Sequence, residues 1–245
     1  MIKIDKAVTY GWVDAVRGMR NPMNSWDKSD SYISDFTDDG KGGFVFGEKD
    51  LDLAKRLSKS GSDHAKFRRM ITVYVDITAP LYWWKEFDTY KVGTVANSCS
   101  TMHKIHDKEF TLDDFSHEHL GVHDINEEGQ SCYRNLWIDK VLPDVVEALN
   151  IARRFYLEET RMDIKKEYWW QMIQTLPSSY NQKRTVMMNY EVLSNIYKAR
   201  KNHKLDEWHG LCLWIEKIPY AMDIVCVGKD YLPRTDKLGA IPFGV

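Results

Sequence analysis

The sequence predicts a single domain of the α+β class, because strand and helix patterns are segregated along the chain. Residues 69–78 alternate apolar and polar side chains, as a half-buried strand does. The second half is almost wholly helical in pattern, and no regular strand–helix–strand repeat links the two halves. A doubly wound parallel sheet is therefore disfavoured, and we expect one domain over residues 1–245.

The composition excludes several classes of protein. With 245 residues, 43% of them hydrophobic and 13% aromatic, the chain can bury a core of its own. A formal net charge of −2 argues against a duplex nucleic acid as partner but leaves a mononucleotide open. The four cysteines form no C-x-x-C pair, which predicts reduced thiols and neither a zinc ribbon nor a disulfide framework. The chain carries no run of about 18 apolar residues and no signal-peptide pattern, so we expect a cytoplasmic protein without a membrane partner.

The first half contains one loop-like tract and three regular elements. Residues 21–50 are rich in Asp, Ser and Gly, which predicts a surface loop or insertion that could order on a ligand. A short helix is expected over 50–60, closed by Gly61, and the strand over 69–78 follows. Pro80 begins the next helix. The stretch 93–100 is small and polar, so a ligand can approach its backbone.

The second half predicts four helices. They cover residues 133–160, with an interruption at Pro143, and then 163–176, 184–201 and 207–217. Prolines follow the second and the fourth, and the tail beyond Gly228 is irregular in pattern.

The predicted helix over 184–201 carries polar groups on its apolar side. Positions i, i+4, i+7 and i+11 share one side of a helix, which aligns Asn189, Leu193, Ile196 and Arg200. A buried arginine without an anionic partner costs several kcal/mol, so Arg200 either pairs with an internal carboxylate or faces a negatively charged ligand. Asn189 and Arg200 would lie roughly 16 Å apart, which suits a nucleotide better than a metal ion. Both explanations stay open.

Further groups could carry chemistry, and each also has a structural explanation. A histidine cluster could bind a metal through His117 and His119, but its spacing matches no zinc signature, so no metal site is expected. Cys99 could be a nucleophile with His103 as its base. The pairs Trp83–Trp84 and Trp169–Trp170 could stack on a ring or simply fill a core. A basic set that suits phosphate oxygens comprises Lys85, Lys91, Lys104, Arg200, Lys201 and Lys204.

Several of these residues carry a resemblance to the flavin-dependent thymidylate synthases. In the second half, the order and spacing resemble that family at Leu176-Pro177, Asn189, Leu193, Asn195, Arg200 and Trp208. In the first half, the similar positions are Ala15 to Arg20, His64, Ala79-Pro80 and the stretch 86–103. The resemblance covers nearly the whole chain and implies an antiparallel sheet with a helix-rich C-terminal half.

The family signature R-H-R-x-x-S-x-N-x-x-S-x-R-Y is degenerate here. The chain reads T-Y-K-V-G-T-V-A-N-S-C-S-T-M-H over residues 89–103. Lys91 could replace the second arginine and Thr94 the first serine, while Asn97 and Ser100 match the later Asn and Ser if one residue is inserted. Both outer arginines lack a counterpart. Lysine or threonine replaces a bidentate arginine contact incompletely, which predicts altered ligand affinity or altered chemistry.

The resemblance implies reductive methylation of dUMP, or modification of a related pyrimidine nucleotide. FAD would be the cofactor, methylene tetrahydrofolate and NADPH the co-substrates, and a homotetramer the assembly. It assigns cofactor binding to His64, Lys91, Asn189 and Asn195. It assigns substrate binding to Glu86, Ser98, Ser100 and Arg200, of which Arg200 would polarise the base as the catalytic residue.

Two other hypotheses stay open. The first is a non-catalytic or repurposed relative that binds a nucleotide or a protein partner. The second is a metal-dependent enzyme built on the histidines of residues 117–123.

Overall fold

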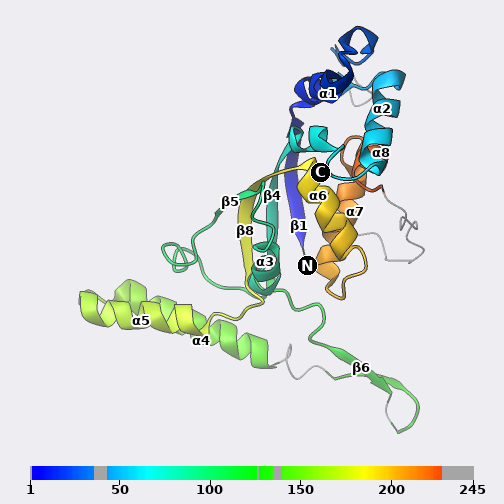
Figure 1. Ribbon diagram of the computed structural model, residues 1–245. Coiled ribbons are helices and arrows are strands. Elements are labelled where there is room, and N and C mark those ends of the chain that lie inside the picture. Colours follow the sequence, from blue (N-terminus) through cyan, green and yellow to red (C-terminus); the bar gives the residue numbers. More distant parts are fainter. Residues whose placement is uncertain (1, 36–42, 126, 135–139, 228–245) are drawn as a thin grey trace. The chain divides into compact units, whose positions relative to one another are not determined.

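The computed structural model describes residues 2–35, 43–125, 127–134 and 140–227, and it confirms the α+β class (Figure 1). The strands are β1 (Lys3–Tyr10), β2 (Tyr32–Ser34), β3 (Gly43–Val45), β4 (Thr72–Pro80), β5 (Val95–Ser98), β6 (Val122–Ile125), β7 (Ser131–Arg134) and β8 (Asn181–Asn189). The helices are α1 (Trp12–Arg20), α2 (Glu48–Lys59), α3 (Leu81–Phe87), α4 (Leu142–Glu158), α5 (Met162–Thr175), α6 (Tyr190–Arg200), α7 (Asp206–Lys217) and α8 (Ala221–Ile224). Short 3-10 helices are η1 (Asn21–Met23), η2 (Trp26–Lys28), η3 (Lys66–Arg69) and η4 (Leu112–Asp114).

The strands form antiparallel sheets, as the resemblance predicts. The largest has four strands in the order β1-β4-β8-β5, and β2–β3 and β6–β7 are hairpins. In β4, Val73, Val75 and Ile77 are buried whereas Tyr74 is exposed, which confirms the half-buried strand expected over 69–78.

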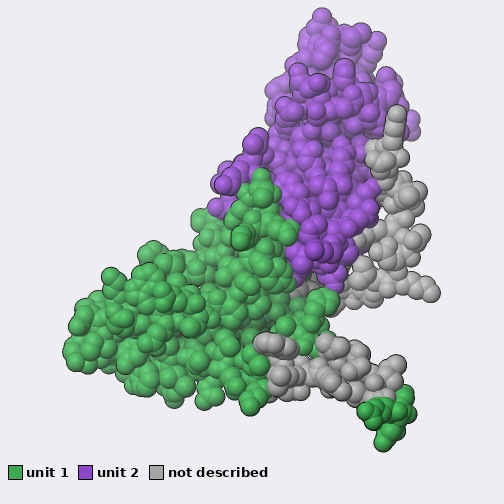
Figure 2. Space-filling model, turned by 60° about the horizontal axis from the view of Figure 1, so that its bottom comes forward, with its two compact units in different colours: residues 1–3, 78–89, 97–184 green, residues 4–77, 90–96, 185–245 purple. Residues whose placement is uncertain are grey.

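The contacts of the chain cluster into two compact units, coloured separately in Figure 2. The first unit comprises residues 1–3, 78–89 and 97–184, and the second comprises 4–77, 90–96 and 185–245. Each strand of the four-stranded sheet runs from one unit into the other. The expectation of a single domain stays a prediction.

Each unit has its own apolar core. In the first unit, α4 and α5 lie side by side, and their buried faces contribute Leu149 and Met172 to a cluster with Phe110 and Phe115. In the second unit, five rings pack at centroid distances of 4.9–6.4 Å. They belong to Trp12, Phe44, Phe46, Tyr190 and Tyr220.

The helix predicted over 184–201 is wrong at its beginning. Residues 181–189 form strand β8, and the helix starts only at Tyr190. Asn189 is the residue that caps this helix, so it does not continue the buried stripe of Leu193 and Ile196. Burial alternates over residues 185–189 of β8, with Val186 and Met188 fully covered, because successive side chains of a strand point to opposite faces of the sheet.

The other predicted helices of the second half are largely confirmed. The segment 133–160 begins too early, since β7 ends at Arg134 and α4 starts at Leu142 with Pro143 in its first turn. The helices over 163–176 and 207–217 are present within a residue at each end. The irregular tail beyond Gly228 lies outside the described residues, and none of the described helices is long and apolar enough to cross a bilayer.

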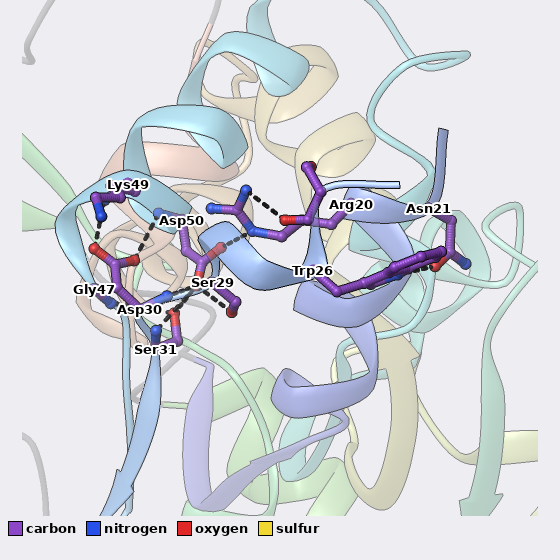
Figure 3. Close-up of polar contacts among 10 residues, drawn as sticks. Arg20, Asn21, Trp26, Ser29, Asp30, Ser31, Gly47, Lys49 and Asp50 are labelled. Carbon is purple, nitrogen blue, oxygen red and sulfur yellow. Dashed lines mark hydrogen bonds and ion pairs between the residues drawn. The ribbon is translucent and has the colours of Figure 1, made fainter. Parts of the chain in front are cut away.

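The tract 21–50 is not wholly a surface loop. It contains η1, η2, the β2–β3 hairpin and the start of α2, while residues 36–42 lie outside the described part. Its last residue, Asp50, is fully buried and pairs with the buried Arg20 at 2.5 Å. Figure 3 shows this carboxylate at the centre of a network that includes Ser29 and Ser31. A buried ion pair therefore anchors the tract at both ends.

Candidate functional site

A cavity of about 420 Å³ in the second unit brings together segments that the sequence analysis singled out. Helix α6 and its cap contribute Asn189 and Asn195, and the turn before β5 contributes Val92 and Gly93. Ser62 and Arg69, from either end of the segment that precedes β4, complete the wall. Both asparagines that the resemblance assigned to cofactor binding thus line the same cavity.

Asn189 is held by its role as helix cap. Its Oδ1 accepts a hydrogen bond from the backbone N–H of Val192 at 3.0 Å, which satisfies one of the free donors at the helix start. The amide nitrogen Nδ2 remains a donor on the side facing Gly93, where a Cβ would lie 2.8 Å from it. The cap therefore fixes which end of the amide a ligand meets.

Gly93 is required by its backbone and by its neighbour. Its φ of +77° is left-handed, and only glycine adopts that region without strain. We expect Gly93→Ala to lower the free energy of unfolding by about 1–2 kcal/mol through backbone strain. A further loss of about 0.5–2 kcal/mol is expected because the Asn189 side chain must move and give up its capping hydrogen bond. Gly61→Ala is the matched control, since its φ is +99° but nothing lies within 4 Å of the added Cβ. Urea unfolding of both variants measures the difference in the free energy of unfolding. Equal losses would show that the Asn189 side chain can move aside without loss of stability.

The charges around the cavity sum to an excess of one positive charge. Glu191 lines the cavity, and its Oε2 lies 2.7 Å from the guanidinium of Arg68, which is 1% exposed. This Oε2 makes no well-aligned hydrogen bond among the described residues, so the pair is held by charge attraction. Arg69 also lines the cavity but is exposed, and no carboxylate pairs with it in the part of the chain that the structure describes. An anion is therefore favoured beside Arg69.

Arg68 links η3 to helices α6 and α8. It donates hydrogen bonds to Ser194 Oγ at 3.1 Å and to the carbonyl oxygen of Ile224 at 3.0 Å. Burial lowers the pKa of Arg68, and the negative charge of Glu191 opposes that effect. Arginine side chains stay charged in proteins, and the Glu191 carboxylate compensates this buried charge.

The residue that follows Gly93 carries a buried polar atom without a partner among the described residues. The hydroxyl oxygen of Thr94, the residue after Gly93, is buried and makes no hydrogen bond within the described residues. Burying such an atom unsatisfied costs free energy, and orphaned groups often mark the place of a ligand or water. Thr94 is also the residue that matches a serine of the family signature.

Arg200, the predicted catalytic residue, does not line this cavity. Its Nε donates a hydrogen bond to Tyr90 Oη at 2.9 Å, and its guanidinium lies 4.6 Å from the ring centre of Trp208. Tyr90 is the first residue of the segment that leads to Gly93, so Arg200 ties that segment to the end of α6. Its catalytic and substrate-binding roles stay predictions.

The remaining predicted residues are distributed over both units. His64 and Lys91 are exposed in the second unit, close in sequence to Ser62 and Val92 of the cavity wall. Glu86, Ser98 and Ser100 belong to the first unit, where Ser100 Oγ accepts a hydrogen bond from the backbone N–H of His103 at 3.0 Å. The binding roles of these five residues stay predictions.

The nucleophile and metal alternatives gain no support. Cys99 is an exposed free thiol, and no contact with the His103 imidazole is found within the described chain. No group of three His, Cys, Asp or Glu among the described residues could hold a metal ion, and the side chain of His123 lies outside them.

Sequence reasoning missed Arg69 and the Arg68–Glu191 pair. The only signal is a pair of adjacent arginines just before a strand. Their meaning depends on η3 packing against α6, a contact between segments more than 120 residues apart.

The comparisons with known proteins concern the fold. The sequence matches no protein-family model, and no curated protein matches it significantly. Two crystal structures of thymidylate synthase X from Helicobacter pylori, each with FAD and dUMP, are similar to this chain with TM-scores of 0.59 at 17% identity. The alignments cover 92% and 91% of this chain and 97% of the bacterial chain. A UMP/dUMP methylase from Streptomyces cacaoi, bound with 5-Br dUMP, aligns with a TM-score of 0.49 at 12% identity over 88% of each chain. The chain thus has the fold of thymidylate synthase X, as the sequence resemblance predicts.

Proposed function

We propose that this chain binds a flavin and a pyrimidine nucleotide and catalyses the reductive methylation of dUMP, or the modification of a related pyrimidine nucleotide. One observation carries the proposal. Asn189, Asn195 and the signature-like turn at Gly93 converge on one cavity whose wall includes the cation Arg69. The fold shared with a thymidylate synthase that was crystallised with FAD and dUMP supports it.

The side chains of the cavity fit these ligands chemically. Carboxamides donate and accept hydrogen bonds, which suits the imide edge that uracil and the flavin ring share. Arg69 supplies a planar, charged donor set for phosphate oxygens. The volume of about 420 Å³ lies within the range of small-molecule sites and would hold part of an FAD molecule or one nucleotide.

In this proposal the chain contributes binding, orientation and electrostatics. Bound FAD would supply the hydride chemistry, with methylene tetrahydrofolate as carbon donor and NADPH as reductant. Asn189 and Asn195 would orient the ring, Arg69 would hold an anionic group, and Arg200 would fix the segment that carries Gly93. In the same proposal the protein acts in the cytoplasm and assembles as a homotetramer.

The test begins with the visible spectrum of protein purified without added cofactor. We expect flavin absorbance, and an increase in Tm when dUMP is added. Arg69→Ala should weaken dUMP binding about tenfold or more, because it removes charge-assisted hydrogen bonds. Lys66→Ala, an exposed cation on the same 3-10 helix, is the matched control and should leave binding unchanged. Absence of both flavin and a dUMP-induced shift, or equal effects of the two variants, would contradict the proposal.

A non-catalytic relative that binds a nucleotide is the second candidate. The loss of both outer arginines from the signature-like stretch favours it, because those positions have no cationic replacement. In that case dUMP raises Tm, Arg200→Ala weakens the shift because it releases the segment that carries Gly93, and labelled dUMP is not converted. Turnover of labelled dUMP by the flavin-loaded protein separates the two candidates.

A further inference from the structure

A second cavity, of about 460 Å³, lies entirely within the first unit. It is bounded by the segment that follows Cys99 and by helices α4 and α5. Its wall includes the side chains of His103, His106, Tyr156, Lys165, Lys166 and Trp169. None of them has a role in the proposed function.

The walls of this cavity are fixed by hydrogen bonds to main-chain oxygens. Trp169 Nε1 donates to the carbonyl oxygen of Met102 at 2.8 Å, which ties α5 to the loop. Arg153 Nε of α4 donates to the carbonyl oxygen of His106 at 2.8 Å, which ties the same loop to the other helix. The rings of His106 and Tyr156 lie 4.5 Å apart. The cavity is therefore preformed, as small-molecule sites usually are.

The charge of the cavity is one-sided. Two lysines and two histidines line it, and no carboxylate is among the described residues of its wall. Lys165 Nζ lies 4.7 Å from the ring centre of Tyr156, and its hydrogen bond to the carbonyl oxygen of Glu159 is long, at 3.5 Å. The nearest acid to His106 is Asp107, at 3.5 Å from Nε2, and Asp107 is also paired with Lys104 at 2.9 Å. Lys165 and Lys166 therefore bring positive charge to a wall that has no carboxylate of its own among the described residues, which favours an anionic ligand.

The loop also carries an unsatisfied group. Nδ1 of His106 is buried and has no hydrogen-bond partner within the described residues. Native proteins leave few such atoms unpaired, and a bound ligand or water frequently completes them. His106 itself belongs to the wall of this cavity.

We propose that this cavity binds a nucleoside phosphate, with the base against Tyr156 and Trp169 and the phosphate at Lys165 and Lys166. Inorganic phosphate or pyrophosphate would satisfy the lysines alone. The two aromatic walls and a volume of about 460 Å³, which lies within the range for nucleotide-sized ligands, favour a phosphate that carries a ring. The site is separate from the cavity at Asn189 and does not depend on the proposed function.

The probe is AMP, compared with adenosine and with pyrophosphate. The readout is the indole N–H signal of Trp169 in a ¹⁵N–¹H correlation spectrum, assigned by its loss in Trp169→Phe, because that N–H lies in the cavity wall. We expect AMP to shift this signal in the wild-type chain and equally in Arg69→Ala, which is altered only at the other cavity. Adenosine should bind at least tenfold more weakly than AMP, and so should pyrophosphate.

The double variant Lys165→Ala, Lys166→Ala should weaken AMP binding at least tenfold. Lys59→Ala combined with Lys198→Ala removes two exposed lysines elsewhere and should leave AMP binding unchanged. A Trp169 signal that does not move in a large excess of AMP would overturn the proposal. So would a shift that disappears in Arg69→Ala, or one that is unaffected by the loss of both lysines. Pyrophosphate binding as tightly as AMP would reduce the site to an inorganic phosphate site and overturn the role of the rings.

Discussion

Asp50→Asn is expected to lower the free energy of unfolding by about 3–5 kcal/mol, because it leaves a buried arginine without its counter-charge. Asp50 is fully buried, and its carboxylate accepts hydrogen bonds from Arg20 Nε at 2.5 Å and from the hydroxyls of Ser29 and Ser31 at 2.8 and 2.7 Å. The backbone N–H groups of Asp30 and Ser31 each donate at 3.0 Å to Oδ2, the oxygen that also accepts from the two serine hydroxyls, whereas Arg20 donates to Oδ1 (Figure 3). A neutral amide replaces one of these acceptor oxygens by a donor.

A neighbouring ion pair on the same helix provides the control. Asp52 pairs with Arg56 at 2.9 Å, but both side chains are 67% exposed. Asp52→Asn should therefore change the free energy of unfolding by only about 0.5 kcal/mol. Urea unfolding of both variants measures the contrast. Similar losses in the two would mean that the buried network contributes no more than a surface pair.

The same carboxylate predicts how stability depends on pH. Burial on its own would raise the pKa of Asp50, but the hydrogen bonds from Ser31, Ser29 and Arg20 outweigh it, so the pKa is lowered. A group whose pKa is lower in the folded chain contributes stability that is fully present above its unfolded pKa and is lost as pH falls through the folded value. The wild-type chain should therefore lose this contribution below about pH 4, whereas Asp50→Asn lacks the dependence.

The elements that sequence patterns located best are those with a single clear period or a clear end. The strand around Val73 to Ile77 alternates strictly, and the helix that Gly61 follows and the one before Pro177 end where these residues require it. β8 was missed because Val186 lies three residues before Asn189 and seven before Leu193, which extends the helical stripe, although Val186 and Met188 together alternate as a strand does. The sheet decides between them, since this strand lies between β4 and β5. Local sequence does not contain that information.

In the candidate site, too, local sequence indicated some residues, whereas others depend on contacts between distant segments. Asn189, Asn195 and the turn at Gly93 were found because their order and spacing within each segment resemble a family pattern. Arg69 and Arg68 could not be found in this way, because their roles arise when η3 meets α6 in space. The sequence pattern also placed Arg200 on a buried stripe, whereas the structure gives it Tyr90 and Trp208 as neighbours at the helix end.

Glu191→Gln is expected to lower the free energy of unfolding by about 3–5 kcal/mol, as Asp50→Asn is, because it also leaves a buried arginine without its counter-charge. Arg68 is 1% exposed, and Glu191, whose Oε2 lies 2.7 Å from it, is the acid paired with it in the described structure. Asp223→Asn is the control, because its pair with Lys55 at 2.8 Å is 35–40% exposed and should contribute at most about 1 kcal/mol. Replacing the buried pair together, by Arg68→Met with Glu191→Leu, should restore part of the loss, since no charge is then left buried alone while the carbonyl oxygen of Ile224 loses its donor.

The single variant Glu191→Gln also separates the effect on stability from the effect on ligand binding. Glu191 lines the cavity, so its loss removes a negative charge from the wall that an anionic ligand would meet. We therefore expect dUMP to raise the Tm of Glu191→Gln by more than it raises that of the wild-type chain, although the unliganded variant melts earlier. A control ligand without phosphate, deoxyuridine, should show no such gain. If dUMP stabilises Glu191→Gln less than the wild type, the phosphate does not lie near Arg69, and the carboxylate itself contacts the nucleotide.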